Sequence, residues 1–281
     1  MRMLITGAGG MLGHDVQAAA DELGHEASGL TRAELDIRDA DAVLRAVAEL
    51  KPEAVINCAA WTDVDGAEDG SDAALAVNGT GAENVGRAAA AAGAWTVHVS
   101  TDYVFDGSRT EPYLESDPTS PMSGYGRSKL EGERALATTA AGRHTIVRSS
   151  WLFGLSGACF PKTILKLAGD RERLSVVDDQ VGCPTFTGHL GAALVRLASD
   201  RPPGILHVAA AGQCSWFEFA REIVTGGGAD CEVSPCTTDE FPRPAPRPAY
   251  SVLRSEWDDA PVLPHWREGL REFLAGLEVA A

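Results

Sequence analysis

The sequence predicts an α/β fold with a doubly wound parallel sheet of the Rossmann type and a smaller C-terminal α/β lobe. Two observations lead to this prediction. Short apolar runs typical of buried strands alternate with longer helical patterns, and such alternation implies parallel strands joined by right-handed crossovers. A glycine-rich turn also stands between the first apolar run and the first helical pattern. The chain of 281 residues, 44% of them hydrophobic, is long enough for both parts.

The first half of the chain, residues 1–153, is expected to form the nucleotide-binding domain. Its strands are expected at residues 2–6, 26–30, 54–57, 95–100 and 144–149. Its helices are expected to run from the glycine-rich turn to Leu23, over 39–50, over 73–92 and onward from about Tyr125. An acidic stretch at 63–72 is predicted to be mostly surface loop, and three prolines exclude a long helix between residues 102 and 124.

The second half, residues 154–281, is expected to form mainly a substrate lobe, with some segments returning to the first domain. Helices are predicted at residues 160–168, 188–199, 215–225 and 265–277, and strands at 174–178 and 205–208. The proline-rich run at 242–248 is predicted to be an extended loop, because it suits neither sheet nor helix.

The composition argues against several classes of function. A formal charge of −16, with no basic cluster, argues against a nucleic-acid partner. No apolar run reaches the roughly 20 residues that span a membrane, and the chain enters a strand at once, so we expect a cytoplasmic protein without a membrane partner. The six cysteines and seven histidines lack metal-ligand spacing, which predicts reduced thiols and no metal site.

The glycine-rich turn has the spacing of a dinucleotide-binding loop. Gly7, Gly10 and Gly13 follow the pattern G-x-x-G-x-x-G between the first strand and the first helix. The first glycine allows a tight turn, the second lets the backbone approach a pyrophosphate, and the third lets the helix pack on the strand. The N–H groups at the start of the helix can then bind the phosphates. A purely structural turn is the competing interpretation.

Residues after the second and third strands indicate which dinucleotide binds. Arg32 stands where NAD-binding folds usually carry an acidic residue, and an arginine suits a ribose 2′-phosphate, so NADPH is the predicted cofactor and NADH the alternative. A solvated arginine is the competing interpretation. Asp36 and Ile37 are expected to flank the adenine. Ala59 and Ala60 either leave room for the cofactor or are simply close-packed.

Tyr125 and Lys129 are candidate catalytic residues. Four residues apart on a helix, they would share one face with Cβ atoms about 5–6 Å apart. We expect the ammonium to lower the pKa of the phenol from about 10 toward the working range of an acid–base catalyst. Two solvated helix residues are the competing interpretation. The Ser-Thr-Asp-Tyr segment at 100–103 favours catalysis, because a hydroxyl at the carboxyl end of a parallel strand can point into the ligand crevice.

Several segments together resemble the extended short-chain dehydrogenase/reductase superfamily, and specifically the family of dTDP-4-dehydrorhamnose reductases. The most specific matches are Ser-Thr-Asp-Tyr-Val-Phe at 100–105 and Asp-Gln-Val-Gly-Cys-Pro-Thr at 179–185. The other matching segments lie at residues 6–13, 55–68, 125–133, 148–153 and 247–253. They span nearly the whole chain in the order of the family.

The resemblance implies NADPH-dependent reduction of the C4 ketone of dTDP-4-dehydro-L-rhamnose to give dTDP-L-rhamnose. Tyr125 would protonate the oxygen that receives charge, Thr101 would hydrogen-bond it, and Lys129 would hold the nicotinamide ribose. Further cofactor residues implied by the resemblance are Gly10, Met11, Leu12, Asp36, Ile37, Ala60, Trp61, Thr62 and Val99. Residues implied for the sugar site are Val64, Asp102, Tyr103 and Trp151. Arg247 and Lys162 would face the diphosphate, although a solvent-facing Arg247 is the competing interpretation.

One departure from the family concerns a magnesium ion that joins two subunits in some members. Asp15 could supply one carboxylate, but the second region, residues 186–189, has none. We therefore predict no structural metal, and both a monomer and a homodimer stay open. Two other functions also stay open: reduction of another dTDP-4-ketosugar in a specialised metabolite pathway, and a non-catalytic role like that of the regulatory subunit of a methionine adenosyltransferase, which has the same fold.

Overall fold

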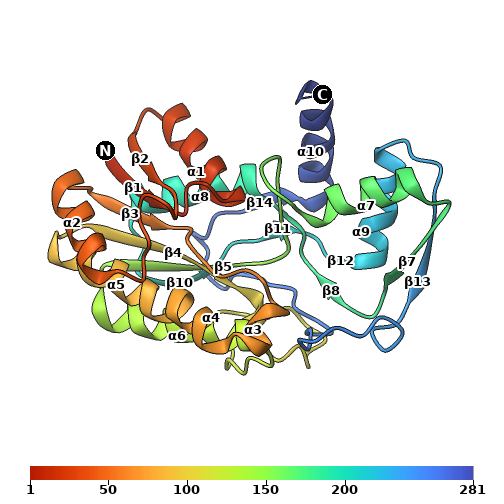
Figure 1. The fold of residues 1–281 in the computed structure, drawn as a ribbon, viewed down its shortest axis with the longest axis horizontal. Helices are drawn as coiled ribbons and strands as arrows, with labels where there is room; N and C mark the ends of the chain where they lie inside the picture. The colour runs from red at the N-terminus through yellow and green to blue at the C-terminus, as the bar shows by residue number, and fades with distance from the viewer. Residues whose placement is uncertain (281) are drawn as a thin grey trace.

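A six-stranded parallel sheet forms the centre of the computed structural model, which describes residues 1–280 (Figure 1). The strands follow the order β2-β1-β3-β4-β5-β10, and every neighbouring pair is parallel. Their bounds are β1 Arg2–Thr6, β2 Glu26–Leu30, β3 Ala54–Asn57, β4 Trp95–Thr101, β5 His144–Ser149 and β10 Gly204–His207. Helices cover both faces, so the prediction of a doubly wound α/β fold is confirmed.

Two groups of helices cover the two faces of the sheet. Helices α1 (Met11–Glu22) and α8 (Thr187–Asp200) pack together on one face. Helices α2 (Ala40–Leu50), α5 (Ala82–Ala91) and α6 (Gly124–Thr139) lie side by side on the other. Because β1 lies between β2 and β3, the connections after β1 and β3 lead to opposite faces, and a ligand crevice forms at their carboxyl ends.

Side-chain caps fix the start of two of these helices, α2 and α6, whereas the start of α1 has no side-chain cap. The carboxylate of Asp39 accepts a hydrogen bond from the Ala42 N–H at 2.9 Å, and the Ser123 hydroxyl accepts one from the Gly126 N–H at 3.1 Å. Helix α1 begins after Gly10 without any side-chain cap. The N–H groups in its first turn therefore lack a side-chain partner and can meet a ligand.

The structure between residues 63 and 92 differs from the sequence prediction. The acidic stretch contains two short helices, α3 (Gly66–Asp69) and α4 (Ser71–Leu75), where mostly loop was expected. The expected single helix at 73–92 is interrupted by a π-helix, η1 (Ala76–Gly81), before α5 begins. Tertiary contacts cause both differences, because Glu68 accepts the N–H of Gly124 at 2.6 Å and the buried Asn78 in η1 binds the backbone of Trp61.

The C-terminal lobe consists of three helices and short strand pairs (Figure 1). The helices are α7 (Phe160–Asp170), α9 (Trp216–Gly226) and α10 (Trp266–Ala280). The strand pairs are β6 (Leu152–Phe153) with β9 (Thr185–Phe186), β7 (Arg173–Val177) with β13 (Glu232–Cys236), β8 (Val181–Gly182) with β12 (Cys214–Ser215), and β11 (Ala210–Ala211) with β14 (Leu263–His265). Phe153, Phe219, Trp266 and Phe273 meet in its buried core.

Two segments of the second half of the chain belong to the central sheet layers. Strand β10 pairs with β5, and α8 packs on α1 and on β3 and β4. A short 3-10 helix, η2 (Asp102–Val104), follows β4 directly. No helix within residues 1–280 has the length and apolar character needed to cross a bilayer.

Replacing Phe219 with alanine should destabilise the lobe strongly. The side chain is 1% exposed and packs among other aromatic rings. We expect the free energy of unfolding to fall by about 3–5 kcal/mol, measured by urea denaturation followed by far-UV circular dichroism. Phe241→Ala serves as the control, because Phe241 is 52% exposed and its loss should change stability by about 0.5 kcal/mol or less.

Candidate active site

The glycine-rich turn after β1 leaves no room for side chains. Gly7 has φ +71°, and a Cβ atom there would lie 2.7 Å from the backbone of Ala59. A Cβ atom at Gly13 would lie 2.2 Å from the carbonyl oxygen of Gly7. The backbones of the turn, α1 and the end of β3 are therefore in direct contact. Together with the uncapped first turn of α1, which contains Met11 and Leu12, this geometry fits a pyrophosphate group.

Two arginines surround Asp36 beyond the end of β2. Arg38 donates from Nε to both carboxylate oxygens of Asp36, at 2.9 and 3.0 Å. This hydrogen bonding, with a smaller effect of the Arg32 charge, lowers the pKa of Asp36 to about 2. Arg32 is exposed, and Ile37 is buried next to Asp36. Sequence reasoning missed Arg38, whose guanidinium forms an ion pair with both carboxylate oxygens of Asp36.

A buried polar cluster fixes the carboxyl ends of β1, β3 and β4 relative to one another. Thr6 donates from Oγ1 to Asn57 Oδ1 at 2.6 Å, and the Asn57 amide nitrogen lies 3.0 Å from His98 Nδ1. Asn57 Oδ1 also accepts the N–H of Ala59 at 3.2 Å. Burial holds the pKa of His98 well below its usual value, so the ring is neutral and its Nδ1 can accept the amide proton.

Asn78 attaches the segment after β3 to helix α6. The amide of Asn78 accepts the Trp61 N–H at 2.8 Å and donates to the Trp61 carbonyl at 3.1 Å and to the Ser128 hydroxyl at 2.9 Å. Ala59, Ala60 and Trp61 are half-buried, and Thr62 is exposed. Sequence reasoning missed Asn78, because a single polar residue in an alanine-rich helix gives no signal that it faces inward.

The three predicted catalytic residues belong to two elements in contact, β4 and α6. Thr101 is the last residue of β4, whereas Tyr125 and Lys129 lie in the first two turns of α6. Lys129 is 2% exposed, and its Nζ donates to the carbonyl oxygen of Val99 at 2.6 Å. Burial lowers the pKa of Lys129 to about 8, although it is opposed by the charge of Glu133. The ammonium thus lies against the strand that ends in Thr101.

The pKa of Tyr125 differs from the sequence prediction. Burial raises it to about 12, while a hydrogen bond with Thr101 opposes the rise. The expectation that Lys129 would lower this pKa was wrong for the structure, because loss of water around the phenol dominates and the ammonium is directed to a carbonyl. The ring of Tyr103 meets Tyr125 edge-on at a centroid distance of 5.8 Å. Tyr125 therefore keeps its proton at neutral pH and can act as a proton donor.

Asp102 is a buried carboxyl group next to this pair. Thr101 donates from Oγ1 to Asp102 Oδ1 at 3.0 Å and accepts the N–H of Tyr103 at 3.2 Å. Burial raises the pKa of Asp102 to about 7. Its Oδ2 atom has no hydrogen-bond partner among the residues that the structure describes. Asp102 is therefore a buried and partly unsatisfied carboxyl group beside the Thr101 hydroxyl.

Trp151 connects the end of β5 with the lobe. Its backbone is left-handed, with φ +49°, and its indole stacks on that of Trp216 at a centroid distance of 3.5 Å and an interplanar angle of 4°. A Cβ atom at Gly182 would lie 2.4 Å from the Trp151 ring, so only glycine fits there. Sequence reasoning missed Trp216, since nothing in its position as the first residue of α9 indicates a partner 65 residues away.

The proline-rich loop is attached to the segment after β3 by ion pairs. Asp65 accepts from Arg243 Nε at 3.0 Å, from the Ala245 N–H at 3.1 Å and from Arg247 Nη1. These bonds, Arg247 first, lower the pKa of Asp65 to about 2. Arg247 is half-buried rather than solvent-facing, and its charge opposes the rise that burial causes in the pKa of Tyr103.

The two remaining candidates for substrate binding, Val64 and Lys162, have no hydrogen bond to Tyr125 or Lys129 among the described residues. Val64 is half-buried beside Asp65. Lys162, in the first turn of α7, donates from Nζ to the carbonyl oxygens of Leu155 and Gly157 at 2.6 and 3.0 Å. The ammonium of Lys162 therefore stabilises the turn before α7 in this structure.

Fold and site together define the class of extended short-chain dehydrogenases and reductases: a dinucleotide-binding sheet, a Thr/Tyr/Lys set at its crevice and a smaller lobe. A model of the family described as RmlD substrate binding domain matches residues 1–279, and the chain belongs to this family. The family prediction from the sequence motifs is thus confirmed.

Individual relatives are similar over almost their whole lengths. The dTDP-4-dehydrorhamnose reductase of Mycolicibacterium smegmatis is 44% identical over 98% of this chain and 86% of its own, and the spore coat polysaccharide biosynthesis protein SpsK of Bacillus subtilis is 42% identical over 97% and 96%. A dTDP-4-dehydrorhamnose reductase structure from Clostridium acetobutylicum has a TM-score of 0.96 at 42% identity, covering 99% of this chain and 100% of its own. That of the Bacillus anthracis reductase in complex with NADP has a TM-score of 0.95 at 38% identity, covering 98% and 99%.

Gly13→Ala should weaken NADPH binding. The new methyl group would meet the Gly7 carbonyl and push α1 away from the turn, so we expect the dissociation constant to rise at least tenfold, measured by the fluorescence of bound NADPH. Gly169→Ala is the matched control, because a Cβ atom there meets no other atom within 4 Å. Equal affinity of the Gly13 variant and the control would contradict the proposed phosphate site.

Proposed function

We propose that this protein reduces the C4 ketone of dTDP-4-dehydro-L-rhamnose to dTDP-L-rhamnose with NADPH. The observation that carries the proposal is the placement of Thr101 and Tyr125 at one end of β4, with the buried ammonium of Lys129 on the same helix as the phenol. Relatives with this reductase name are 43–44% identical to the chain. The substrate is thus a small dTDP-sugar, and we infer that the enzyme works in the cytoplasm, without nucleic acid or membrane.

The residues of the crevice fit NADPH. The glycine turn would hold the pyrophosphate, Arg32 and Arg38 the 2′-phosphate, and Lys129 the nicotinamide ribose. NADPH, when bound, supplies a hydride to the ketone carbon. NADH remains the weaker alternative, since both arginines favour the additional phosphate. Ala60 and Val99 would border the space between these groups.

Proton transfer is the part of the reaction that the chain itself performs. Negative charge develops on the ketone oxygen, and Tyr125 donates its proton there. A phenol whose pKa is about 12 is fully protonated at neutral pH, which suits the reducing direction. Thr101 supplies a second hydrogen bond by turning its hydroxyl from Asp102 to the oxygen. Lys129 would hold the nicotinamide ribose, and its ammonium bonds the Val99 carbonyl instead of the phenol.

The sugar nucleotide would lie between the end of β5 and the proline-rich loop. Asp102, Tyr103 and Trp151 would contact the sugar, with Val64 beside them. Arg247 would face the diphosphate, since it supplies a half-buried positive charge in a chain with a net charge of −16. Lys162 could join it only by releasing the two carbonyl groups that it binds here. The absence of a structural metal and the choice between monomer and homodimer stay predictions.

A second candidate substrate is another dTDP-4-ketosugar. A relative from Streptomyces niveus, named dTDP-4-keto-6-deoxy-D-glucose reductase, is 40% identical over 96% of the chain. Its reaction would use the same Thr/Tyr/Lys set, so only the sugar pocket separates the two. Turnover of both ketosugars, with the products identified by NMR, distinguishes the two candidate substrates.

A non-catalytic role like that of a regulatory subunit is the other alternative. Failure to oxidise NADPH with every ketosugar, together with tight capture of a protein partner, would favour that role.

Tyr125→Phe should remove most of the reductase activity and leave cofactor binding intact. The variant lacks only the proton donor, so we expect kcat to fall by about 10²–10⁴-fold with less than a threefold change in the NADPH dissociation constant. Tyr250→Phe is the control, because it also removes one phenolic hydroxyl, which here donates to the side chain of the exposed Gln213 at 3.0 Å. Unchanged kcat in the Tyr125 variant would exclude this residue as the acid.

Arg32→Ala should weaken NADPH more than NADH. If the guanidinium contacts the 2′-phosphate, we expect the ratio of the two dissociation constants to shift at least tenfold toward NADH. Arg87→Ala is the control, because Arg87 pairs with Glu83 on the exposed surface of α5. Equal losses for both cofactors, measured by fluorescence titration, would show that Arg32 does not recognise the phosphate.

A further inference from the structure

Helix α6 carries a second buried charge, Glu133, two turns after Tyr125 and one turn after Lys129. Glu133 is 3% exposed, and both of its carboxylate oxygens are bound. Arg148 donates from Nε to Oε1 at 2.9 Å and from Nη2 to Oε2 at 2.7 Å, and Ser100 donates to Oε1 at 2.5 Å. A carboxylate with three donors and no acceptor partner is ionised.

The donors to Glu133 come from the two strands that carry the reacting end of the site. Ser100 precedes Thr101 in β4, and Arg148 in β5 is the register partner of Ser100. Thr101 itself is paired with Ser149. The Glu133 carboxylate therefore attaches α6 to β4 and β5 one residue before Thr101. Any slip of α6 along the sheet would break all three hydrogen bonds at once.

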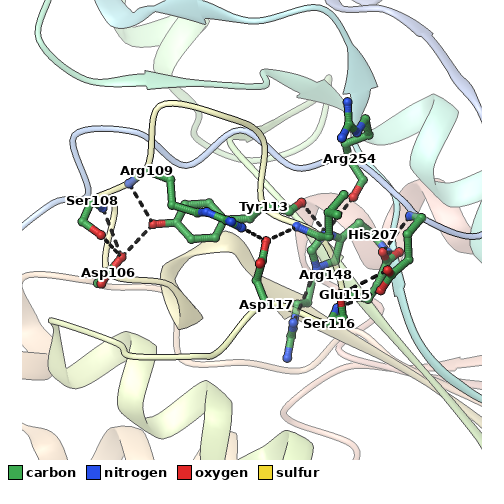
Figure 2. Close-up of polar contacts among 12 residues, drawn as sticks. Asp106, Ser108, Arg109, Tyr113, Glu115, Ser116, Asp117, Arg148, His207 and Arg254 are labelled. Atoms are coloured by element: carbon green, nitrogen blue, oxygen red, sulfur yellow. Dashed lines mark hydrogen bonds and ion pairs between the residues drawn. The ribbon is translucent and has the colours of Figure 1, made fainter.

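Arg148 also contacts groups other than Glu133, and Figure 2 shows it beside His207. Its guanidinium lies over the ring of Phe105 at 5.1 Å, and its Nη1 is 3.5 Å from His207 Nε2. His207 Nδ1 lies 3.0 Å from the carbonyl oxygen of Tyr113, so the proton is on Nδ1 and Nε2 accepts from Arg148. His207 is consequently neutral, and Glu133 is the anion that the Arg148 cation contacts within residues 1–280.

The charge of Glu133 also acts on Lys129, which lies one turn earlier on the same helix and whose pKa it raises against the effect of burial. The groups that face its ammonium are the thiol of Cys58 after β3, the His98 ring of β4, the Val99 carbonyl and Glu133 of α6. Burial raises the pKa of Cys58 to about 12 and holds that of His98 well below its usual value, so both are neutral at pH 7. Among these groups, Glu133 supplies the negative charge that opposes desolvation of the ammonium.

We propose that Glu133 is a positioning residue of the reductase, which fixes α6 against Thr101 and keeps Lys129 in its charged form. This inference rests on the proposed function, in which Tyr125 donates the proton and Lys129 binds NADPH. Its first part predicts misplacement of Tyr125 when the carboxylate is lost. Its second part predicts that the amine loses its proton at a lower pH.

The test is Glu133→Gln, which keeps the shape of the side chain and removes its charge. In the wild type, activity and NADPH affinity should decline as pH rises through about 8, where Lys129 loses its proton. Without the anion the pKa of Lys129 falls further, so in the variant both declines should move about one to two pH units lower. At pH 7.5 we expect kcat to fall at least tenfold. Glu131→Gln, exposed on the same helix and paired with Arg134, is the control.

A double variant, Glu133→Gln with Arg148→Met, separates positioning from stability. It removes the unpaired buried cation, so the midpoint of thermal unfolding should recover toward the wild type even if the single variant folds poorly. In the double variant, activity and NADPH affinity should still decline at the lower pH seen in Glu133→Gln, because the negative charge of Glu133 is still missing. A double variant with wild-type stability and a wild-type pH profile would overturn the proposal, and so would failure to fold in both variants, because Glu133 would then have a structural role alone.

NADPH binding supplies a readout that does not need the sugar. In the wild type, NADPH affinity should decline near pH 8, and in Glu133→Gln it should decline at a lower pH. This result supports the role of Glu133 even when no dTDP-ketosugar is reduced. Absence of turnover in the wild type would instead refute the proposed function. An identical pH dependence of NADPH binding in wild type and variant would refute the inference while leaving the proposed function intact.

Discussion

The burial of two charged side chains on helix α6 is the constraint on which the site depends. Lys129 and Glu133 are 2% and 3% exposed, and each would cost several kcal/mol to bury without partners. The Val99 carbonyl and the Arg148 guanidinium meet these charges only when α6 lies at one position along β4 and β5. The same position places Tyr125 at the end of β4. Satisfaction of buried charge therefore sets the position of the Tyr125 phenol relative to Thr101.

Local signals were sufficient to predict most of the fold. The strand at 144–149 has the bounds expected from its apolar run, and the strands at 2–6, 26–30 and 54–57 also agree. The strands at 2–6 and 54–57 are short apolar segments, as in parallel strands buried on both faces, whereas the strand at 26–30 is a half-exposed strand at the edge of the sheet. The glycine turn was predictable for a similar reason, because Gly7 and Gly13 are required by backbone contacts within the turn and with the next loop.

Long-range polar contacts account for what the sequence could not predict. Asn78, Trp216 and Glu133 have partners from distant segments, and an isolated polar or aromatic residue in a helix gives no sign of which face is buried. The pKa of Tyr125 was predicted with the wrong sign for a related reason. The Tyr-x-x-x-Lys spacing shows a nearby cation, whereas the loss of water that raises the pKa to about 12 depends on packing that only the folded chain has.

The stacked indoles of Trp151 and Trp216 join the central sheet to the core of the C-terminal lobe. Trp151 follows the sheet strand nearest the crevice, but its ring rests on the first residue of α9, whose other neighbours form the core of the lobe. A substitution within that core would therefore move the Trp151 ring without changing the glycine-rich turn after β1. If Trp151 lines the sugar site as proposed, the choice of sugar can be altered from the lobe alone, at a distance from the dinucleotide.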